Sequence, residues 1–580
     1  MTYNGKVNIE IPAGTNLDDV LADVPNSKEE TPTVTMQEVP DDHQPTKPVK
    51  TPPVSDILMG IIESKATLFK DKASTAYAKI DSECLPVRST RFKRKIQREF
   101  HITNGKVPHT QAMQDCIDQA EGKALFEGKT YDVNVRSAFV DGKILIDLGD
   151  DSHTVVEVTK DGWSYGTDSR VYFYRPNGLN ELPRPVQSDD IDLLRPFVNV
   201  ENDADFRLIV AELLAALHPG IAAPILNLQG EQGSSKSTTT KVLRSLIDPN
   251  AAPIRAAPRD ERELIIQAQN SRMLCFDNLS GVKSWLSDAL CRICTGGGFS
   301  ARKLYTNDEE MIFQIQRPII LNGIDDIATR GDLLDRSIVL NLPAIPQENR
   351  KDEGQFWNDF NKVRQKIIGA LLHGLSYGLK YQDEITHDKL PRMADFARFV
   401  AGCERAYGWD TILDDYNRNQ GQAVEAGLDS DILASAIRKI MKDLSKWSGT
   451  ATELIEKIEQ VAVDVDSRYL PTTRTLKSRL TRLSPAFRQV GITWYRDRVE
   501  SGTEYVIKKS VNNVQVVQGV QESNKNNDLQ AGTTLQNPDN LAERARNVQG
   551  SKPLADNKSC RTGRTCTTEQ QLFNDSQAPF

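Results

Sequence analysis

Residues Ile225–Thr240 read ILNLQGEQGSSKSTTT, which is an apolar run, a loop with two glycines, and then a lysine followed by hydroxyl residues. Gly230 and Gly233 allow a tight turn that brings backbone N–H groups close to an anion. The helix expected after the loop points the positive end of its dipole at the same place. The stretch therefore predicts a phosphate-binding loop between a strand and a helix. We expect nucleotide contacts from Gly230, Glu231, Gln232, Gly233, Ser234, Ser235, Lys236, Ser237 and Thr238.

The loop matches the pattern G-x-x-x-x-G-K-[ST] except at Ser235, which stands where the pattern has its second glycine. In that pattern Lys236 reaches the β- and γ-phosphates and the Ser237 hydroxyl binds Mg²⁺. The alternative is an ordinary Gly/Ser-rich loop before a helix. Val242 and Leu246 give the following segment a buried helical face, which favours the phosphate-binding loop. The expected cofactors are therefore ATP and Mg²⁺.

A second apolar run, SRMLCFDNLS, predicts a buried parallel strand that ends near Asp277. Open α/β sheets bind ligands at the carboxyl ends of their strands, so Asp277 is the candidate second ligand of Mg²⁺. Asn278 follows, at a position where many ATPases of this plan carry a second acid. An amide orients a water molecule but cannot take its proton. Hydrolysis is therefore expected either to be slow or to use Glu261 or Glu263.

Two further apolar runs complete the predicted sheet. RPIILNGID ends near Asn322, whose amide is placed to contact the γ-phosphate or the attacking water. SIVLNLP follows Arg330 and Arg336, and a guanidinium there can neutralise the charge that develops on a transferred phosphoryl group. We favour Arg336 over Arg330. Between the second and third runs, residues 299–305 and 311–315 predict an inserted hairpin.

The order of phosphate loop, FDN, inserted hairpin, IILNG and RGDLLDRSIVLNLP resembles the ATPase domain of superfamily 3 helicases, especially the phage, plasmid and poxvirus-type primase-helicases. The similarity covers about residues 195–345. It implies an AAA+-like domain in a hexameric ring, with ATP hydrolysed between subunits and single-stranded DNA moved by the hairpin. Three departures from the family pattern are Ser235, Asn278 and the acidic hairpin turn at 308–310.

Carried over by position, the resemblance implies a role for each matching residue. The residues at the nucleotide would be Lys236, Ser237, Asp277, Asn322 and Arg336. Among them, Asn322 would be the sensor of the γ-phosphate, and Arg336 would reach toward the neighbouring subunit. Arg302 and Lys303 would be the DNA-facing residues of the hairpin.

The chain has 580 residues and a formal net charge of -8, which allows three or four domains and neither supports nor excludes a nucleic-acid partner. The N-terminus lacks the basic start and apolar core of a signal peptide, and no run of about eighteen apolar residues occurs. We therefore expect a cytoplasmic protein that does not act at a membrane. Cys291 and Cys294 form a C-x-x-C, but both fit a buried helical face, so core packing is preferred to zinc.

The C-terminal third contains a compact pattern of helices and strands. SGTATELIEKIEQ and PTTRTLKSRLTRL predict two helices, and GITWYRDRVESGTEYVIKK predicts two strands. This order suggests a winged helix-turn-helix. The second helix carries Arg474, Lys477, Arg479 and Arg482 opposite a leucine-rich face, which favours DNA binding over a module used only for protein packing.

Together these patterns predict a multidomain α/β protein. Its expected parts are a disordered arm at 1–54, an N-terminal α+β unit with a β-rich portion at 55–181, a linker at 182–200, a P-loop AAA+-like ATPase core at 201–345, a helical module at 346–442, a winged helix-turn-helix at 443–510 and a disordered tail at 511–580.

The leading functional hypothesis is an ATP-dependent DNA helicase or translocase-like ATPase that acts in the replication of a mobile genetic element. The alternative is a replication initiator or regulator that uses ATP to assemble on DNA with little unwinding. Asn278 and the acidic hairpin turn favour the alternative, whereas the hairpin and the order of sensor and arginine favour the motor. A small-molecule phosphotransferase is the third possibility, and it would be a monomer whose ATP turnover ignores DNA.

Overall fold

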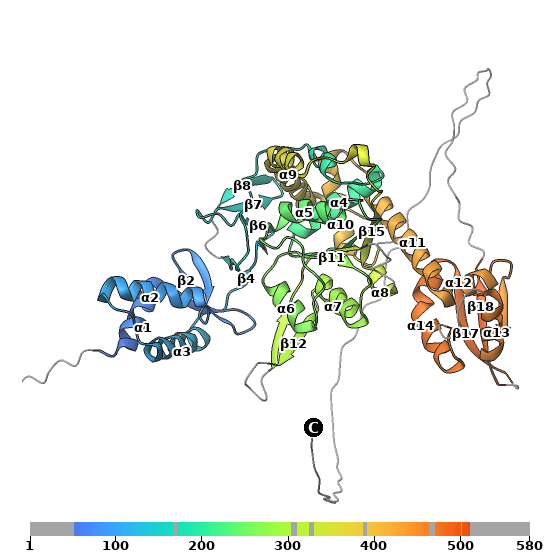
Figure 1. Ribbon diagram of the computed structural model, residues 1–580, viewed down its shortest axis with the longest axis horizontal. Coiled ribbons are helices and arrows are strands. Elements are labelled where there is room, and N and C mark those ends of the chain that lie inside the picture. Colours follow the sequence, from blue (N-terminus) through green and yellow to red (C-terminus); the bar gives the residue numbers. More distant parts are fainter. Residues whose placement is uncertain are drawn as a thin grey trace, which may run out of the picture. The chain divides into compact units, whose positions relative to one another are not determined.

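The structure is a computed structural model that describes residues 52–166, 171–302, 310–323, 330–386, 391–462, 470–499 and 502–510 (Figure 1). The fold is mixed α/β, with several hydrophobic cores along the chain. The expected disordered tails lie outside the described residues, except that the first helix already begins at Val54. None of the described helices is long and apolar enough to cross a membrane.

The first part of the chain is a small α+β unit with its own core. Its elements are α1 (Val54–Lys65), β1 (Ala66–Lys70), β2 (Ala76–Ile80), β3 (Glu83–Pro86), α2 (Thr90–Asn104) and α3 (Thr110–Phe126). The three strands form an antiparallel sheet in the order β1-β2-β3. Phe92, Ile96 and Phe100 of α2 recur at helical spacing and are all buried in this core.

Most of the β-rich portion that follows belongs to a different core from the one before it, although Val133 and Tyr172 pack with Phe69 of the preceding unit. Its elements are β4 (Val133–Asn134), β5 (Ser137–Val140), β6 (Lys143–Asp147), β7 (Val155–Thr159), β8 (Gly162–Gly166) and β9 (Tyr172–Phe173). Strands β5 to β8 form an antiparallel sheet, and Ile144, Ile146 and Val156 are buried together with residues of the central domain. The predicted unit at 55–181 thus contains two packing units, because the apolar face of this sheet is covered by later helices rather than by α1 to α3.

The segment at 182–200, which we expected to be a linker, is packed. It contains the 3₁₀ helix η2 (Ile191–Phe197). Leu182, Leu194 and Phe197 are buried in the central core, and Phe197 contacts two phenylalanine rings of a later helix. Its prolines suggested an exposed connection, but burial of these apolar side chains outweighs that signal.

The central domain alternates helices with parallel strands. Its elements are α4 (Asp203–Leu217), β10 (Ile225–Gln229), α5 (Lys236–Ile247), α6 (Glu261–Gln269), β11 (Leu274–Leu279), α7 (Ser284–Thr295), β12 (Gly298–Arg302), β13 (Glu310–Gln314), β14 (Ile319–Gly323), α8 (Gly331–Leu334) and β15 (Ser337–Asn341). Strands β12 and β13 pair antiparallel, as expected of the inserted hairpin.

The central sheet is parallel and has the order β11-β14-β10-β15. Strand β14 therefore lies between β10 and β11, although it follows both in the chain. Both faces are buried, and successive side chains alternate between two cores: Leu226 and Ile320 face one, while Ile225 and Leu321 face the other. Helices on both faces explain why the strands read as continuous apolar runs.

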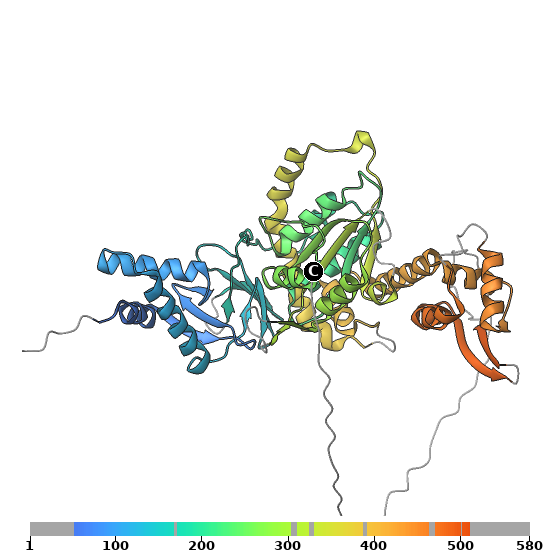
Figure 2. The ribbon, with the colours of Figure 1, turned by 60° about the horizontal axis from the view of Figure 1, so that its bottom comes forward.

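Helices that follow β15 complete the central core and connect it to the last module. They are η3 (Gln347–Asn349), α9 (Glu353–Tyr381), η4 (Gln382–Glu384), α10 (Ala394–Cys403), η5 (Glu404–Tyr407) and α11 (Ile412–Ser430). Phe360, Leu371 and Phe399 are buried with the central domain, so most of the expected helical module shares the central core. Helix α11 runs onward from this core into the C-terminal module (Figure 2).

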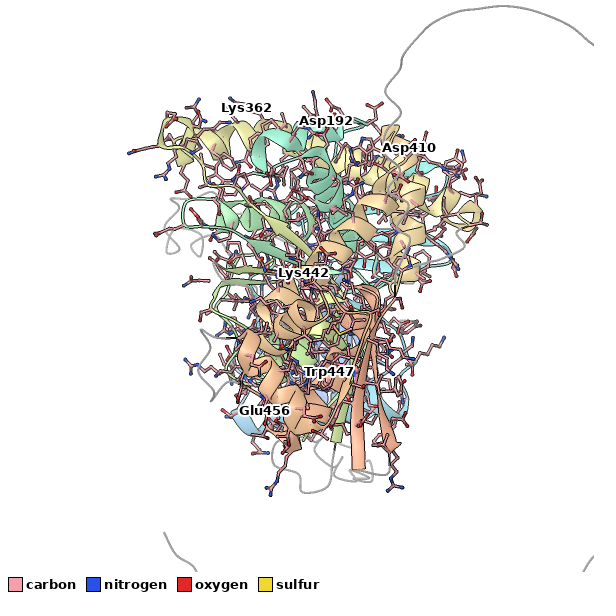
Figure 3. The ribbon with its side chains drawn as sticks, turned by 90° about the vertical axis from the view of Figure 1, so that its right-hand side faces the viewer. Asp192, Lys362, Asp410, Lys442, Trp447 and Glu456 are labelled. Atoms are coloured by element: carbon pink, nitrogen blue, oxygen red, sulfur yellow. The ribbon has the colours of Figure 1, made fainter. Side chains whose placement is uncertain are left out.

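The C-terminal module combines helices with a three-stranded antiparallel sheet. Its elements are α12 (Ile432–Ile440), β16 (Lys446–Gly449), α13 (Ala451–Val461), α14 (Thr473–Gln489), β17 (Ile492–Val499) and β18 (Gly502–Lys509). The sheet order is β16-β18-β17. Trp447 of β16 and Glu456 of α13 locate the module in Figure 3. The two predicted helices and both predicted strands are present, and β16 adds a third strand.

Glu212 is a buried carboxyl group in α4. It is 1% exposed, and neither carboxylate oxygen has a hydrogen-bond partner among the described residues. Burial raises the pKa of Glu212 well above its ordinary value, and the charge of Arg272 opposes that shift. Because the pKa is raised in the folded state, ionisation of Glu212 opposes folding. Stability is fully present below the unfolded pKa of about 4.3 and is lost as the pH rises toward the folded pKa.

We therefore expect Glu212→Gln to melt at a higher temperature than the wild type at pH 8, with a difference that shrinks toward pH 4. Each unit of pKa shift corresponds to about 1.4 kcal/mol in the free energy of unfolding. Thermal denaturation between pH 4 and 8 measures the effect, with Glu456→Gln on an exposed helix face as the control. If the melting temperatures of wild type and Glu212→Gln depended on pH in the same way, ionisation of Glu212 would not oppose folding as expected here.

Candidate functional site

The loop after β10 has the backbone that the sequence predicts. Gly230 and Gly233 have φ of 145° and 89°, and Ser235 has φ of 61°. A side chain at Gly230 would collide with the carbonyl oxygen of Leu342, so only glycine fits there. Ser235 takes the left-handed conformation without being glycine, which identifies the departure from the motif as a strained position. Lys236 is the first residue of α5, so N–H groups at the start of this helix face the loop.

Lys236 folds back over the loop. Its Nζ donates hydrogen bonds to the carbonyl oxygens of Gly230 at 2.7 Å and Glu231 at 2.8 Å, and to Ser234 Oγ at 3.2 Å. Burial lowers the pKa of Lys236, and the charge of Asp277 opposes that shift. The ammonium group is thus held at the loop by neutral acceptors. An anionic ligand is a stronger partner for it than these carbonyls.

Ser237 and Asp277 lie together, although forty positions separate them in the chain. The Ser237 Oγ donates to Asp277 Oδ1 at 3.0 Å. A hydroxyl oxygen and a carboxylate oxygen are hard donors of the kind that Mg²⁺ prefers, so the two residues fit a Mg²⁺ ion that would be completed by water and phosphate oxygens. This pair is the part of the cavity that the predicted Mg²⁺ site requires.

A chain of hydrogen bonds links β11, β14 and α5 behind this pair. The Asn278 backbone N–H donates to Asn322 Oδ1 at 2.9 Å and to Asp277 Oδ1 at 2.9 Å. The Asn322 Nδ2 donates to Thr240 Oγ1 at 3.1 Å. Asn278 has φ of 55°, and the β11–β14 register shifts between Phe276 and Leu279, so a bulge lies at the site.

These groups converge because the three strands are parallel and adjacent. The carboxyl ends of β10, β11 and β14 open on one cavity of about 1050 Å³. Predicted residues that line it are Gln232, Gly233, Ser234, Ser235, Lys236, Ser237, Thr238, Asp277, Asn278 and Asn322. Gly230 and Glu231 do not line it, and both contribute carbonyl oxygens to Lys236 instead.

Arg330 and Arg336 lie away from this cavity. Arg330 pairs with Asp288 at 2.9 Å, and Arg336 Nη1 donates to the carbonyl oxygen of Asp332 at 2.9 Å. Arg336 precedes β15, which is parallel to β10, so it lies at the opposite end of the sheet from the loop that follows β10. Neither arginine lines the cavity. The Arg336 Nε is buried without a hydrogen-bond partner in the described part of the chain.

The two acids that we considered as substitutes at Asn278 are placed elsewhere. Glu261 pairs with Arg292 at 2.7 Å. Glu263 accepts hydrogen bonds from the Arg259 N–H and from the Gln267 side chain at the start of α6. Neither lines the cavity. Their helix, α6, lies between the loop helix and β11 in the chain, but both acids are bound to partners outside the cavity.

The cavity also contains groups that the sequence pattern did not indicate. Asn199 donates to the carbonyl oxygens of Ser234 at 3.0 Å and Pro343 at 2.7 Å, and so fastens two segments together. Arg350 and Lys351 line the cavity together with Lys236 and Lys241, so its cations outnumber its carboxylates, Asp277 and Glu353. No local motif marks them, because only the path of the chain after β15 brings them to the loop.

Of the added cations, Arg350 lies beside the loop that follows β10. Its guanidinium lies at 3.2 Å from the place that a Cβ of Gly233 would occupy, and its Nε donates to the carbonyl oxygen of Ile345 at 3.4 Å. The Ile345 N–H in turn donates to the Gly233 carbonyl oxygen at 3.3 Å. The segment after β15 therefore holds an exposed guanidinium beside the loop.

The expected DNA contacts are described only in part. Arg302 is placed as a residue of β12, and Lys303, with most of the acidic turn at 308–310, lies outside the described residues. On α14, Arg474, Lys477 and Arg482 are exposed. Arg479 is half-buried and pairs with Asp431 at 3.5 Å. Three of the four expected residues on α14 are thus available at the surface, while the fourth is held within the module.

The chain matches two protein-family models. The model described as the replication protein of actinomycete integrative conjugative elements, AICE RepA, matches residues 191–421. The model of the C-terminal domain of the same protein, AICE RepA, matches residues 433–518. No curated protein sequence matches the chain. The first match contains the cavity, and the second contains α12 to α14 and the three-stranded sheet.

Solved structures of the C-terminal region of NrS-1 are also similar in part. One apo form has a TM-score of 0.37 and 12% identity, and covers 79% of this chain and 99% of that chain. A second apo structure has the same TM-score and identity, and covers 79% and 98%. Similarity at this level carries no functional argument. The two family models describe consecutive parts of one protein and together match more than half of the residues, in the order in which they occur here. The chain belongs to the replication proteins of actinomycete integrative conjugative elements.

Proposed function

We propose that the chain is an ATP-dependent DNA helicase or translocase that acts in the replication of its element. The observation that supports this most directly is the single cavity at the ends of β10, β11 and β14. It collects Lys236, the Ser237–Asp277 pair and Asn322, which are the groups needed to bind a nucleoside triphosphate and its metal ion. The family assignment supplies the replication context.

In this proposal each residue has a separate task. Lys236 leaves the carbonyl oxygens of Gly230 and Glu231 and turns to the β- and γ-phosphates. Ser237 and Asp277 would hold Mg²⁺, which would neutralise charge on those phosphates. Asn322 lines the cavity and is held by Thr240 and the Asn278 N–H, and its remaining amide hydrogen is the proposed contact to the γ-phosphate or its water.

The proposed ring places ATP between subunits. Arg336 lies at the far end of the sheet from its own cavity, so its action on ATP requires a neighbour. A guanidinium from the next subunit would stabilise the charge on the transferred phosphoryl group. We place Arg330 second, because it is already paired with Asp288.

DNA contact is assigned to the hairpin β12–β13 and to α14. Arg474, Lys477 and Arg482 occupy the exposed side of α14, opposite Leu476 and Leu480, which are buried in the module core. Helices with one basic and one buried face bind the phosphate backbone and enter DNA grooves in winged-helix proteins. The hairpin contact remains a proposal from the resemblance alone.

A second candidate function is an ATP-switched initiator that binds DNA and assembles but turns over slowly. The observation that favours it is that an amide follows Asp277 on β11: Asn278 occupies the position of a second acid, and Glu261 and Glu263, which do not line the cavity, have other partners. Without a carboxylate at that position to act as general base, the rate of hydrolysis is expected to be lower by about 10²- to 10⁴-fold.

ATP hydrolysis by the full chain, with and without single-stranded DNA, separates these functions. The motor predicts turnover that DNA stimulates, and an oligomer by light scattering when ATP is bound. The initiator predicts ATP and DNA binding with little turnover under either condition. A monomer whose ATP turnover is insensitive to DNA would contradict both the motor and the initiator, and would favour a small-molecule phosphotransferase.

Arg350→Ala tests the cation that the sequence did not indicate. We expect it to weaken ATP binding by about 10- to 100-fold, because hydrogen bonds to charged groups contribute about 1.5–3 kcal/mol. A fluorescent ATP analogue measures the dissociation constant. Arg262→Ala, an exposed arginine away from the cavity, is the control. Unchanged affinity in Arg350→Ala would leave this residue without a part in binding.

A further inference from the structure

Helix α11 belongs to two hydrophobic cores at once. It is a single helix of 19 residues. Ile412 and Tyr416, near its start, are buried in the central core that contains β10 and β15. Val424 and Leu428, near its end, are buried in the core of the C-terminal module. One continuous helix thus contributes side chains to both cores.

The same helix holds the edge of the central sheet. Among the described strands, β10 is the one that pairs with β15, so β15 is an edge of this sheet. On its other side, Asn419 of α11 makes two hydrogen bonds to Val339: the Val339 N–H donates to Asn419 Oδ1 at 3.0 Å, and Asn419 Nδ2 donates to the Val339 carbonyl oxygen at 2.7 Å. Gln420 donates to the carbonyl oxygen of Ser337. Asn419 is 7% exposed, so its amide replaces a neighbouring strand in a site nearly closed to water.

Helix α11 also contacts the segment on the other side of Arg336. Leu334 of α8 packs against Gly427, where an added Cβ would lie 2.6 Å from Leu334 Cδ1. Helix α8 packs against α14 as well as α11. Arg336 lies between these two anchors, two residues after Leu334 and one residue before β15 begins at Ser337. Both sides of the Arg336 backbone are thus held by the helix that enters the C-terminal module.

We propose that Asn419 is a positioning residue for Arg336, through which DNA bound to the C-terminal module controls ATP turnover in the neighbouring subunit. This inference rests on the proposed function. Asn419 does not touch the cavity; it fixes the register of α11 on β15. A shift of the module moves α11, and α11 moves the Arg336 segment at both of its anchors. Coupling then travels through packed elements and hydrogen bonds that link the two sites physically.

Asn419→Ala and Asn417→Ala form a matched pair for the test. Asn417 is exposed on the same helix two residues earlier. In Asn419→Ala we expect ATP affinity to stay at the wild-type value, because Arg336 acts on the neighbour's ATP. The stimulation of turnover by a single-stranded DNA oligonucleotide should fall about fivefold or more, as for the loss of a typical coupling between sites. Asn417→Ala should behave as wild type.

Gly427→Ala provides an independent variant at the second anchor. The added methyl group meets Leu334, so the same loss of DNA stimulation with retained ATP affinity is expected. Undiminished stimulation in both Asn419→Ala and Gly427→Ala would overturn the inference. So would a parallel loss of ATP affinity and melting temperature in both variants, since a purely structural role predicts that pattern.

Hydrogen exchange in the full chain separates failure of this inference from failure of the proposed function. We expect the DNA oligonucleotide to change amide exchange in residues 330–341 of wild type and Asn417→Ala, and not of Asn419→Ala. If DNA binds but exchange in 330–341 is unchanged in wild type, the inference is wrong even if ATP is hydrolysed. If wild type hydrolyses no ATP but exchange responds to DNA, the helicase proposal fails and the structural coupling stands. If DNA does not bind, both are wrong.

Discussion

Replacing Lys236 with alanine is expected to lower kcat for ATP hydrolysis by about 10²- to 10³-fold, the loss that follows removal of one group that stabilises transition-state charge. The change removes the only side chain of the loop that carries positive charge. In the structure its Nζ contacts the loop carbonyls of Gly230 and Glu231, so the loop loses hydrogen bonds that it can replace with water. Steady-state hydrolysis with and without single-stranded DNA measures the effect.

The control for this variant is Lys366→Ala, an exposed lysine of α9 away from the cavity. It should retain wild-type turnover. Circular dichroism should show the same melting temperature for Lys236→Ala as for wild type. Turnover in Lys236→Ala within a few-fold of the wild-type rate would contradict the assignment of the loop, because no other cation of the loop could take over its role.

The second large effect, on the free energy of unfolding, is expected from replacing Asp248, the residue that follows α5. Its carboxylate pairs with Arg136 Nε at 3.4 Å and Arg244 Nη2 at 3.6 Å, and it accepts the backbone N–H groups of Arg272 and Met273 at 2.9 and 3.3 Å. Arg136, Arg244, Arg272 and Asp248 are each at most 3% exposed. One acid therefore balances a cluster of buried guanidinium groups, and Arg136 brings in the sheet β5–β8.

Asp248→Asn keeps the shape of the side chain and removes its charge. We expect a loss of about 3–5 kcal/mol in the free energy of unfolding, because breaking a buried pair leaves an uncompensated charge. Burial already lowers the pKa of Arg272 to about 9, which shows how poorly the site solvates a cation. Urea denaturation followed by circular dichroism measures the change. Asp383→Asn, at an exposed position, should shift the urea midpoint little. An equally small shift in Asp248→Asn would show that Asp248 does not balance the buried guanidinium groups.

Several parts of the site could be predicted because their signals are local. Gly230 and Gly233 have positive φ where the motif requires it, and Lys236 begins a helix as its position in the motif implies. The apolar runs before Asp277 and Asn322 are strands, since fully buried parallel strands read as continuous apolar segments. Periodicity and turn chemistry act over a few residues, so the sequence carries them directly.

Other expectations failed where distant contacts decide the outcome. The segment at 182–200 reads as a linker, yet Phe197 is buried against α9. The sequence near Glu261 indicates no partner for its carboxylate, yet in the structure Glu261 pairs with Arg292. Arg479 belongs to the basic pattern of α14, and the fold gives it Asp431 as a partner. In each case the partner lies dozens of residues away or more, beyond the reach of a local pattern.

By itself, the sequence determined the chemistry available to this protein: a glycine-containing loop with Lys236 and Ser237, polar residues at strand ends, an inserted hairpin and a basic helix near the C-terminus. Tertiary structure alone decided which of these groups meet. It placed β14 between β10 and β11, brought Arg350 to the loop, separated Arg336 from its own cavity and set Asn419 on the edge of β15. The physical reason is that strand order and long-range packing depend on the burial of whole faces, whereas motifs and periodicity depend on neighbours along the chain.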